Sequence, residues 1–186
     1  SRLGFNADNF IIGNISRFDE QKNQQLILQA AYFLVRKYPQ MRFVFVGSGK
    51  HLEQMRDLAR DSKLEEYVVF AGDQENLVDF YSIFDIFVFP SLWEGMPYVL
   101  LEAMASRLPI ICSRLPNLLE VVKSDYSAFT INPRDMDDLF RKISAMYQSK
   151  ELREELAQNA MIESTQYDIS ETVPKIERVY NEVLSS

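Results

Sequence analysis

Residues 84–106 read FDIFVFPSLWEGMPYVLLEAMAS and divide into a strand, a loop and a helix. The apolar run Ile86–Phe89 predicts a buried strand, a Pro-Ser pair ends it, and the run from Tyr98 to Ser106 has the pattern of a helix. Glu94 stands in the loop and Glu102 in the early turns of the helix. Both carboxylates are therefore expected near the carboxyl end of a strand, where open α/β sheets bind their ligands.

The chemistry of this strand–helix junction favours one kind of ligand. A helix amino end carries unpaired N–H groups and a partial positive charge, so it suits a phosphate. Carboxylates beside it repel phosphate, but they accept hydrogen bonds from hydroxyl groups on either side of it. Compensation of the helix dipole would be a sufficient explanation for Glu94, but it does not explain Glu102. Glu102 lies in an apolar stretch, where a carboxylate needs a partner. Together the two glutamates favour a nucleotide-sugar, which has hydroxyl groups on both sides of a diphosphate.

The whole chain alternates apolar, β-rich runs with amphipathic helical runs. The expected strands are Phe10–Ile15, Arg42–Val46, Val68–Phe70, Ile86–Phe89, Pro109–Cys112 and Ala128–Ile131. The expected helices are Gln21–Lys37, Leu52–Arg60, Asn76–Ile83, Tyr98–Ser106, Asn117–Val122, Asp137–Gln148, Glu151–Ser164 and Ser170–Leu184. Strand–helix–strand order at this spacing requires right-handed crossovers, so we expect an α/β fold with a Rossmann-like parallel sheet flanked by helices and extra C-terminal helices.

Two further loops are expected at the same edge of the sheet. After the first strand, Arg17 can place two donors on phosphate oxygens, and Lys22 in the next helical turn can add a point charge. Taken alone, the two residues fit equally well as solvated cations near a helix start. After the second strand comes Val46-Gly47-Ser48-Gly49-Lys50, which lacks the spacing of a P-loop. Its glycines fit either close contact with a ligand or an ordinary tight turn, and the sequence alone leaves both open.

Composition and the remaining motifs exclude several functions. The net charge of −7 argues against nucleic acid as a partner. The only cysteine, Cys112, lies in an apolar run and is expected to be buried as a small hydrophobic residue. A single cysteine cannot form a disulfide within the chain, which fits a reducing compartment. Asp135 and Asp137 have a spacing that can hold a metal, but they open a helix and are explained by capping. We therefore expect no metal and no cofactor.

In their order along the chain, these motifs resemble a known family of enzymes. Glu94 and Glu102 match a Glu-(x)7-Glu motif, and Arg17 and Lys22 match its basic pair. The Val46–Gly49 turn, the strand end Phe70-Ala71-Gly72 and Glu120 also look like family features. Between about Ile12 and Leu184 the chain thus resembles the donor-binding half of the retaining group 1 glycosyltransferases, glycosyltransferase family 4, which have the GT-B fold.

The resemblance implies a role for each matching residue. Arg17 and Lys22 would bind the donor diphosphate and steady the departing nucleoside diphosphate. Glu94 would contact the donor sugar near its reacting centre, and Glu102 would accept hydrogen bonds from the ribose hydroxyls. Catalysis is thus expected from Glu94, Arg17 and Lys22 without a metal. Donor contacts are expected from Arg17, Lys22, Gly47, Gly49, Gly72, Glu94, Gly95, Met96, Pro97, Tyr98, Val99 and Glu102.

The chain also departs from the family pattern. The family usually has glycine at the positions of Pro97, Arg107 and Ala128, and a glycine pair near Leu115-Pro116. The last change lies near the donor loop and leaves the identity of the donor sugar open.

The length of the chain sets its expected organisation. With 186 residues it has room for one nucleotide-sugar-binding domain, residues 1–186, and we expect an amino-terminal acceptor domain to be missing. The expected partners are a nucleotide-sugar and that missing domain, through which any peripheral membrane contact would be made. We expect a cytoplasmic location, with the inner face of the membrane as the site of such contact.

We expect a glycosyltransferase of hexosyltransferase type, active in polysaccharide or glycoconjugate synthesis and inactive as the isolated chain. Two alternatives stay open: a non-catalytic regulatory domain that binds a nucleotide-sugar, and a nucleotide-sugar epimerase of the same fold.

Overall fold

A computed structural model describes residues 4–168, 170 and 174 of this chain. These residues form a six-stranded, fully parallel sheet with the strand order β3-β2-β1-β4-β5-β6. The strands are β1 (Phe10–Ile15), β2 (Met41–Val46), β3 (Val68–Gly72), β4 (Ile86–Phe89), β5 (Ile110–Ser113) and β6 (Phe129–Ile131). The expected Rossmann-like sheet is confirmed. Successive strands are added to one side of β1 up to β3, and from β4 on they are added to its other side. β1 and β4 are therefore direct neighbours, although 70 residues of sequence lie between them.

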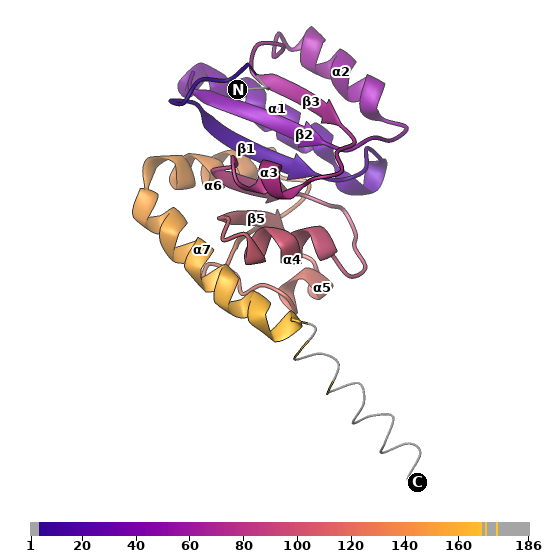
Figure 1. Ribbon diagram of the computed structural model, residues 1–186. Helices are drawn as coiled ribbons and strands as arrows, with labels where there is room; N and C mark the ends of the chain where they lie inside the picture. Colours follow the sequence, from indigo (N-terminus) through magenta and orange to yellow (C-terminus); the bar gives the residue numbers. More distant parts are fainter. Residues whose placement is uncertain (1–3, 169, 171–173, 175–186) are drawn as a thin grey trace.

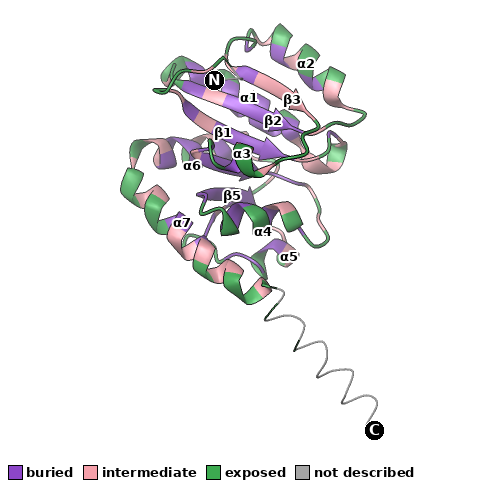
Figure 2. Ribbon diagram, viewed as in Figure 1, coloured by how far each residue is buried: buried purple, intermediate pink, exposed green. Residues whose placement is uncertain are grey.

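Helices cover the sheet on both faces. The helices are α1 (Gln24–Lys37), α2 (Leu52–Asp61), α3 (Val78–Tyr81), α4 (Tyr98–Ala105), α5 (Pro116–Leu119), α6 (Met136–Gln148) and α7 (Lys150–Ser164). One core lies between the sheet and α1, α2 and α6, and the other lies between the sheet and α3, α4 and α5 (Figure 1). This double covering explains why β4 and β5 are buried along their whole length (β5 is labelled in Figure 2).

Some predicted helix bounds are wrong. The first helix begins at Gln24 and not at Gln21, because a 3-10 turn, η1 (Glu20–Lys22), precedes it and Asn23 adopts a left-handed φ of 54°. Asparagine tolerates this conformation better than most residues. The helix expected at Asn76–Ile83 is only the single turn α3, and that at Asn117–Val122 is α5. A further 3-10 turn, η2 (Thr165–Tyr167), follows α7. The helix expected at Ser170–Leu184 falls almost entirely outside the described residues.

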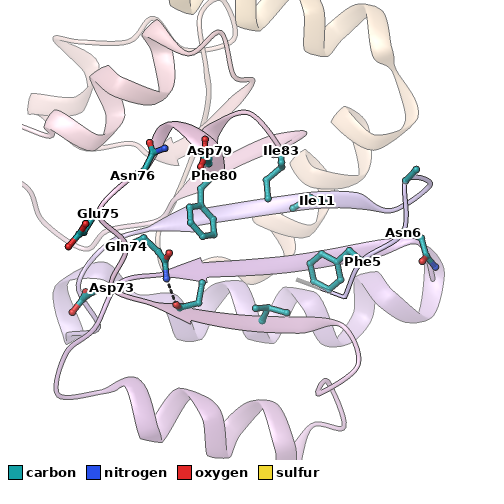
Figure 3. Close-up of a pocket in the computed structure, with 13 residues that line it drawn as sticks. Phe5, Asn6, Ile11, Asp73, Gln74, Glu75, Asn76, Asp79, Phe80 and Ile83 are labelled. Carbon is teal, nitrogen blue, oxygen red and sulfur yellow. Dashed lines mark hydrogen bonds between the residues drawn. The ribbon is translucent and has the colours of Figure 1, made fainter. Parts of the chain in front are cut away.

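The shortness of α3 leaves part of the sheet open. On the face opposite α1 and α2, β3 is only partly buried beyond its first residue. A hollow of about 1130 Å³ lies over this face, between the segment Phe5–Ala7 at one end and the loop Asp73–Asn76 at the other (Figure 3). Its apolar floor includes Ile11, Val69 and Ala71, and Phe80 and Ile83 line the side near α3.

Candidate functional site

The loops that follow β1 and β4 lie side by side at the carboxyl edge of the sheet. Their strands are paired, with Ile12 opposite Ile86, so both loops leave the sheet at the same place. The Leu92 N–H donates to the Gln21 carbonyl at 2.8 Å, and the Gln21 side chain donates to the Trp93 carbonyl at 2.8 Å. The turn η1 is thereby fastened to the loop that carries Glu94.

Lys22 and Glu94 form an ion pair at this edge. Lys22 Nζ lies 2.5 Å from Glu94 Oε1, and the two side chains are only 14% and 5% exposed. Gln21 Nε2 donates to the other oxygen, Glu94 Oε2, at 3.3 Å. The ammonium also lies 5.0 Å from the centre of the Phe89 ring, a cation–π distance. The Glu94 carboxylate is thus oriented by two residues of one 3-10 turn.

Arg17 lies on the same loop, but its side chain is 77% exposed and its guanidinium pairs only loosely with Asp19, at 3.6 Å. The backbone at Arg17 is held by Gln24 of α1, whose Nε2 donates to the Arg17 carbonyl at 2.7 Å and to Ser16 Oγ at 2.8 Å. Ser16 Oγ in turn donates to Asn14 Oδ1. Arg17 therefore has an anchored backbone and a side chain open to a ligand at the rim.

Glu102 has a different partner from Glu94. Its Oε2 accepts a hydrogen bond of 2.8 Å from the hydroxyl of Tyr81, the last residue of α3. Burial, followed by the bond to Glu102 and its negative charge, raises the pKa of Tyr81 far above its ordinary value. Among the contacts of the described residues, none joins Glu102 to Glu94 or to Arg17. The partner that Glu102 requires inside its apolar stretch is thus Tyr81.

The glycines after β2 have a packing reason. Gly47 and Gly49 have φ of 128° and 149°, and a Cβ on them would lie 2.2 Å from the Ser16 carbonyl oxygen and 2.4 Å from the Phe18 carbonyl oxygen. The Phe18 N–H also donates to the Ser48 carbonyl at 2.8 Å. The loop after β2 therefore packs directly against the loop that bears Arg17, which accounts for both glycines as a tight turn. Gly72, at the end of β3, has a φ of 70° with no neighbour close to its missing Cβ.

The loop between Glu94 and α4 is held by Asn117 of α5. The Asn117 side-chain amide donates to the Glu94 carbonyl at 2.8 Å and to the Gly95 carbonyl at 2.7 Å. Pro97 comes directly before α4 and is buried, whereas the side chains of Met96 and Tyr98 are exposed beside it. The Tyr98 N–H donates to the Met96 carbonyl at 3.2 Å, and Val99 is half-buried. The predicted donor residues of this segment thus surround the first turn of α4.

Asp135 and Cys112, which the sequence analysis excluded from the functional site, have structural roles. Asp135 caps α6, since its side chain accepts from the Asp138 N–H at 2.9 Å. Cys112 is fully buried, and burial raises the pKa of its thiol to about 12. Over the described part of the chain, no three His, Cys, Asp or Glu residues are grouped so that they could hold a metal.

A search of the same residues found no helix of the length and apolarity needed to cross a membrane.

Sequence reasoning missed Gln21, Tyr81 and Asn117, although each contacts a predicted site residue. Gln21 could have been noticed, because it lies one position before Lys22 at a predicted helix start. Tyr81 and Asn117 carry no such signal, because their partners are 21 to 23 residues away and depend on how α3 and α5 pack.

A comparison with known families decides what kind of chain this is. Residues 1–162 match the family described as "Glycosyl transferases group 1". The chain belongs to this family. The match covers 162 of the 186 residues and includes Arg17, Lys22, Glu94 and Glu102.

Individual relatives agree with this membership. The chain is 27% identical over 183 residues to the UDP-Gal:alpha-D-GlcNAc-diphosphoundecaprenol alpha-1,3-galactosyltransferase of Escherichia coli, covering 96% of this chain but only 47% of that protein. The structure of Anabaena Alr3699/HepE with UDP and glucose has a TM-score of 0.86 at 23% identity, over 100% of this chain and 50% of that one. The C-terminal domain of the group 1 protein LpcC from Francisella tularensis has a TM-score of 0.79 at 24% identity, over 90% and 97% of the two chains. The likeness to these two solved structures shows the GT-B-type, Rossmann-like fold, and the chain spans about half the length of the full-length relatives.

Proposed function

We propose that this domain binds the donor of a retaining glycosyltransferase of family 4, which transfers a hexosyl group from a nucleoside-diphosphate sugar to an acceptor. The observation that carries the proposal is the nearly buried Lys22–Glu94 pair at the carboxyl edge of the sheet, with the exposed guanidinium of Arg17 on the same loop. A cation and a carboxylate held together at this position fit a ligand that has both a diphosphate and hydroxyl groups.

In this proposal the diphosphate lies between Arg17, Lys22 and the amino end of α4. Breaking the anomeric bond leaves negative charge on the departing nucleoside diphosphate and positive charge on the sugar ring. Arg17 stabilises the first charge as a forked donor, and the helix amino end adds its partial positive charge. Glu94 faces the donor sugar near the reacting carbon, and Lys22 serves both the carboxylate and the phosphate. The residues supply these charges without a metal.

Glu102 accepts a hydrogen bond from a ribose hydroxyl in the same proposal. One of its oxygens is occupied by Tyr81, and the other is available to a ligand at 2.7–3 Å, the usual range for such bonds. Gly47, Gly49 and Gly72 lie at the ends of the neighbouring strands β2 and β3 and line the side of the nucleoside. Gly95, Met96, Pro97, Tyr98 and Val99 surround the phosphates.

The domain is one half of the active enzyme in this proposal. The chain covers about half of the E. coli and Anabaena proteins, and the LpcC domain of similar extent is described as a C-terminal domain. An amino-terminal domain would bind the acceptor and complete the cleft, so the isolated chain should bind a donor weakly and transfer nothing. UDP and glucose in the Anabaena structure, and galactosyl transfer to a lipid-linked sugar by the E. coli relative, favour a UDP-hexose donor and glycoconjugate synthesis. The cytoplasm as the place of this synthesis is part of the proposal.

A thermal-melting panel with UDP, GDP, ADP and their hexose conjugates tests the proposal. A ligand present at about 100 times its Kd stabilises the folded state by about 2.7 kcal/mol. For a chain of this size that shift is roughly 5–10 °C in Tm. The Lys22→Met variant should lose the shift, and Arg141→Ala, on the exposed surface of α6, should keep it.

The outcomes separate this proposal from its alternatives. If none of the nucleotides raises Tm, the donor-binding role is wrong. If the full-length protein binds a nucleotide-sugar but transfers no sugar, the regulatory alternative is favoured. An altered nucleotide-sugar as the product would instead identify an epimerase.

A further inference from the structure

The hydroxyl of Tyr81 makes a contact that the proposed reaction does not by itself explain. Tyr81 ends α3, is 4% exposed, and packs its ring edge against Phe87 of β4, with the ring centres 6.0 Å apart. Its hydroxyl lies 2.8 Å from Glu102 Oε2 and 3.4 Å from the Val99 carbonyl oxygen. The tyrosine therefore connects the only turn of α3 with the middle of α4.

The direction of the hydrogen bond follows from the chemistry of the atoms. A carboxylate and a carbonyl oxygen only accept, so the single Tyr81 proton must be the donor, and the shorter distance assigns it to Glu102. Burial and the neighbouring carboxylate raise the pKa of Tyr81, so the hydroxyl keeps this proton at physiological pH. Glu102 Oε2 thus accepts from Tyr81. Within residues 4–168, no side chain or backbone group donates a hydrogen bond to Oε1, which can accept from another partner.

We propose that Tyr81 is a positioning residue, which holds the Glu102 carboxylate so that Oε1 faces a hydroxyl of the donor ribose. The inference rests on the proposed donor-binding function. A glutamate side chain has three rotatable bonds, and fixing them before the ligand arrives removes an entropic cost from binding. Tyr81 is rigid enough to do this, since its own ring is buried against Phe87.

The test measures binding of UDP and of its 2′-deoxy and 3′-deoxy forms by calorimetry, with GDP or ADP replacing UDP if one of these gives the larger Tm shift. The variants are Tyr81→Phe, Glu102→Ala and the control Tyr147→Phe. Tyr147 also donates its hydroxyl to a side-chain oxygen, Gln40 Oε1 at 3.3 Å, but it lies on α6 at the other face of the sheet.

We expect Tyr81→Phe to weaken binding of the ribose form about five- to tenfold, a typical effect of one lost hydrogen bond. The loss should be less than about twofold for the deoxy form that lacks the hydroxyl bound by Glu102. Tyr147→Phe should bind every form like the wild type. In the full-length protein, Tyr81→Phe should raise the donor KM by a similar factor and leave kcat within about twofold.

A merely structural role for Tyr81 gives a different pattern. Equal losses for the ribose and deoxy forms, or wild-type affinity of Tyr81→Phe for the ribose form, would overturn the inference. Alanine at position 102 has no side-chain acceptor. A Glu102→Ala variant that still discriminates the forms as the wild type does would therefore disprove the ribose role of Glu102 itself, and the inference about Tyr81 with it. A melting curve of Tyr81→Phe confirms that the variant is folded at the titration temperature.

Discussion

Lys22 Nζ lies 2.5 Å from Glu94 Oε1, and this contact joins the loop after β1 to the loop after β4. The two residues are 72 positions apart in the sequence. Because both side chains are mostly removed from water, each depends on the other for compensation of its charge. The pair is consequently part of the fold as well as part of the proposed donor site.

The first prediction concerns this ion pair. Lys22→Met should lower the free energy of unfolding by about 3 kcal/mol, because the Glu94 carboxylate stays nearly buried without its cation. Adding Glu94→Gln to Lys22→Met should recover most of this loss, which denaturant titration of both variants measures. As a control, Lys150→Met should change stability by less than about 0.5 kcal/mol, since Lys150 pairs with Glu154 in solvent. Additive losses in the double variant would contradict the prediction.

The second prediction separates the function of Arg17 from stability. Arg17→Ala should leave the unfolding free energy within about 0.5 kcal/mol, because its side chain is 77% exposed. In the full-length protein, transfer should fall by about 10²–10³-fold, the effect of removing one preorganised donor. Arg141→Ala is the matched control, since Arg141 is also exposed and paired with a nearby aspartate on α6. Normal turnover in Arg17→Ala would refute its assigned role.

The third prediction concerns the glycine after β2. Gly49→Ala should destabilise the fold by about 1–3 kcal/mol, because a Cβ at φ 149° would meet the Phe18 backbone. Since Phe18 follows Arg17 directly, the substitution should also weaken nucleotide binding. Gly95→Ala serves as the stability control, because nothing lies within 4 Å of its added Cβ. Equal melting temperatures for the two variants would show that the contact between the loops matters little.

The fourth prediction concerns the support of the Glu94 loop by α5. Asn117→Ala removes the donor that holds the Glu94 and Gly95 carbonyls, so the loop should lose its fixed conformation. We expect a three- to tenfold weaker affinity for the nucleotide, roughly the effect of one or two lost hydrogen bonds. Asn159→Ala is the control, since Asn159 also donates to a carbonyl, that of Tyr126, but on α7. Calorimetry on both variants decides, and an unchanged affinity of Asn117→Ala would remove this residue from the site.

The fold could be predicted because the apolar runs carry their own signal. The β4 sequence and the first three residues of β5 are apolar, as strands covered on both faces should be, and the predicted positions of both strands lie within one residue of those in the structure. The predicted start of α1 is wrong because the sequence pattern around Asn23 is compatible with a helix. In the structure, the side-chain amide of Asn23 instead donates to the Pro90 and Pro133 carbonyls. Arg107, where the family usually has glycine, follows the C-cap Ser106 of α4 and has a φ of 58°, which explains that family preference.

The sequence predicted only those site residues that belong to local motifs. Glu94, Lys22 and Arg17 follow strand ends, and parallel strands bring those ends to one edge. The supporting side chains of Tyr81 and Asn117 act through contacts between elements, and their neighbours in the sequence give no indication of the partner. The sequence also paired Glu94 with Glu102, whereas their carboxylates have separate protein partners, Lys22 and Tyr81.

The closeness of Lys22 to Glu94 has a consequence for how an anionic donor arrives. The ammonium and the carboxylate cancel at long range, and the chain as a whole carries a charge of −7. Electrostatic attraction from a distance then depends mainly on Arg17 and the α4 dipole. We therefore expect slow association with the proposed anionic donor, at a rate that rises as added salt screens the repulsion by the chain's negative charge. The site would then select its ligand through contacts made after the encounter.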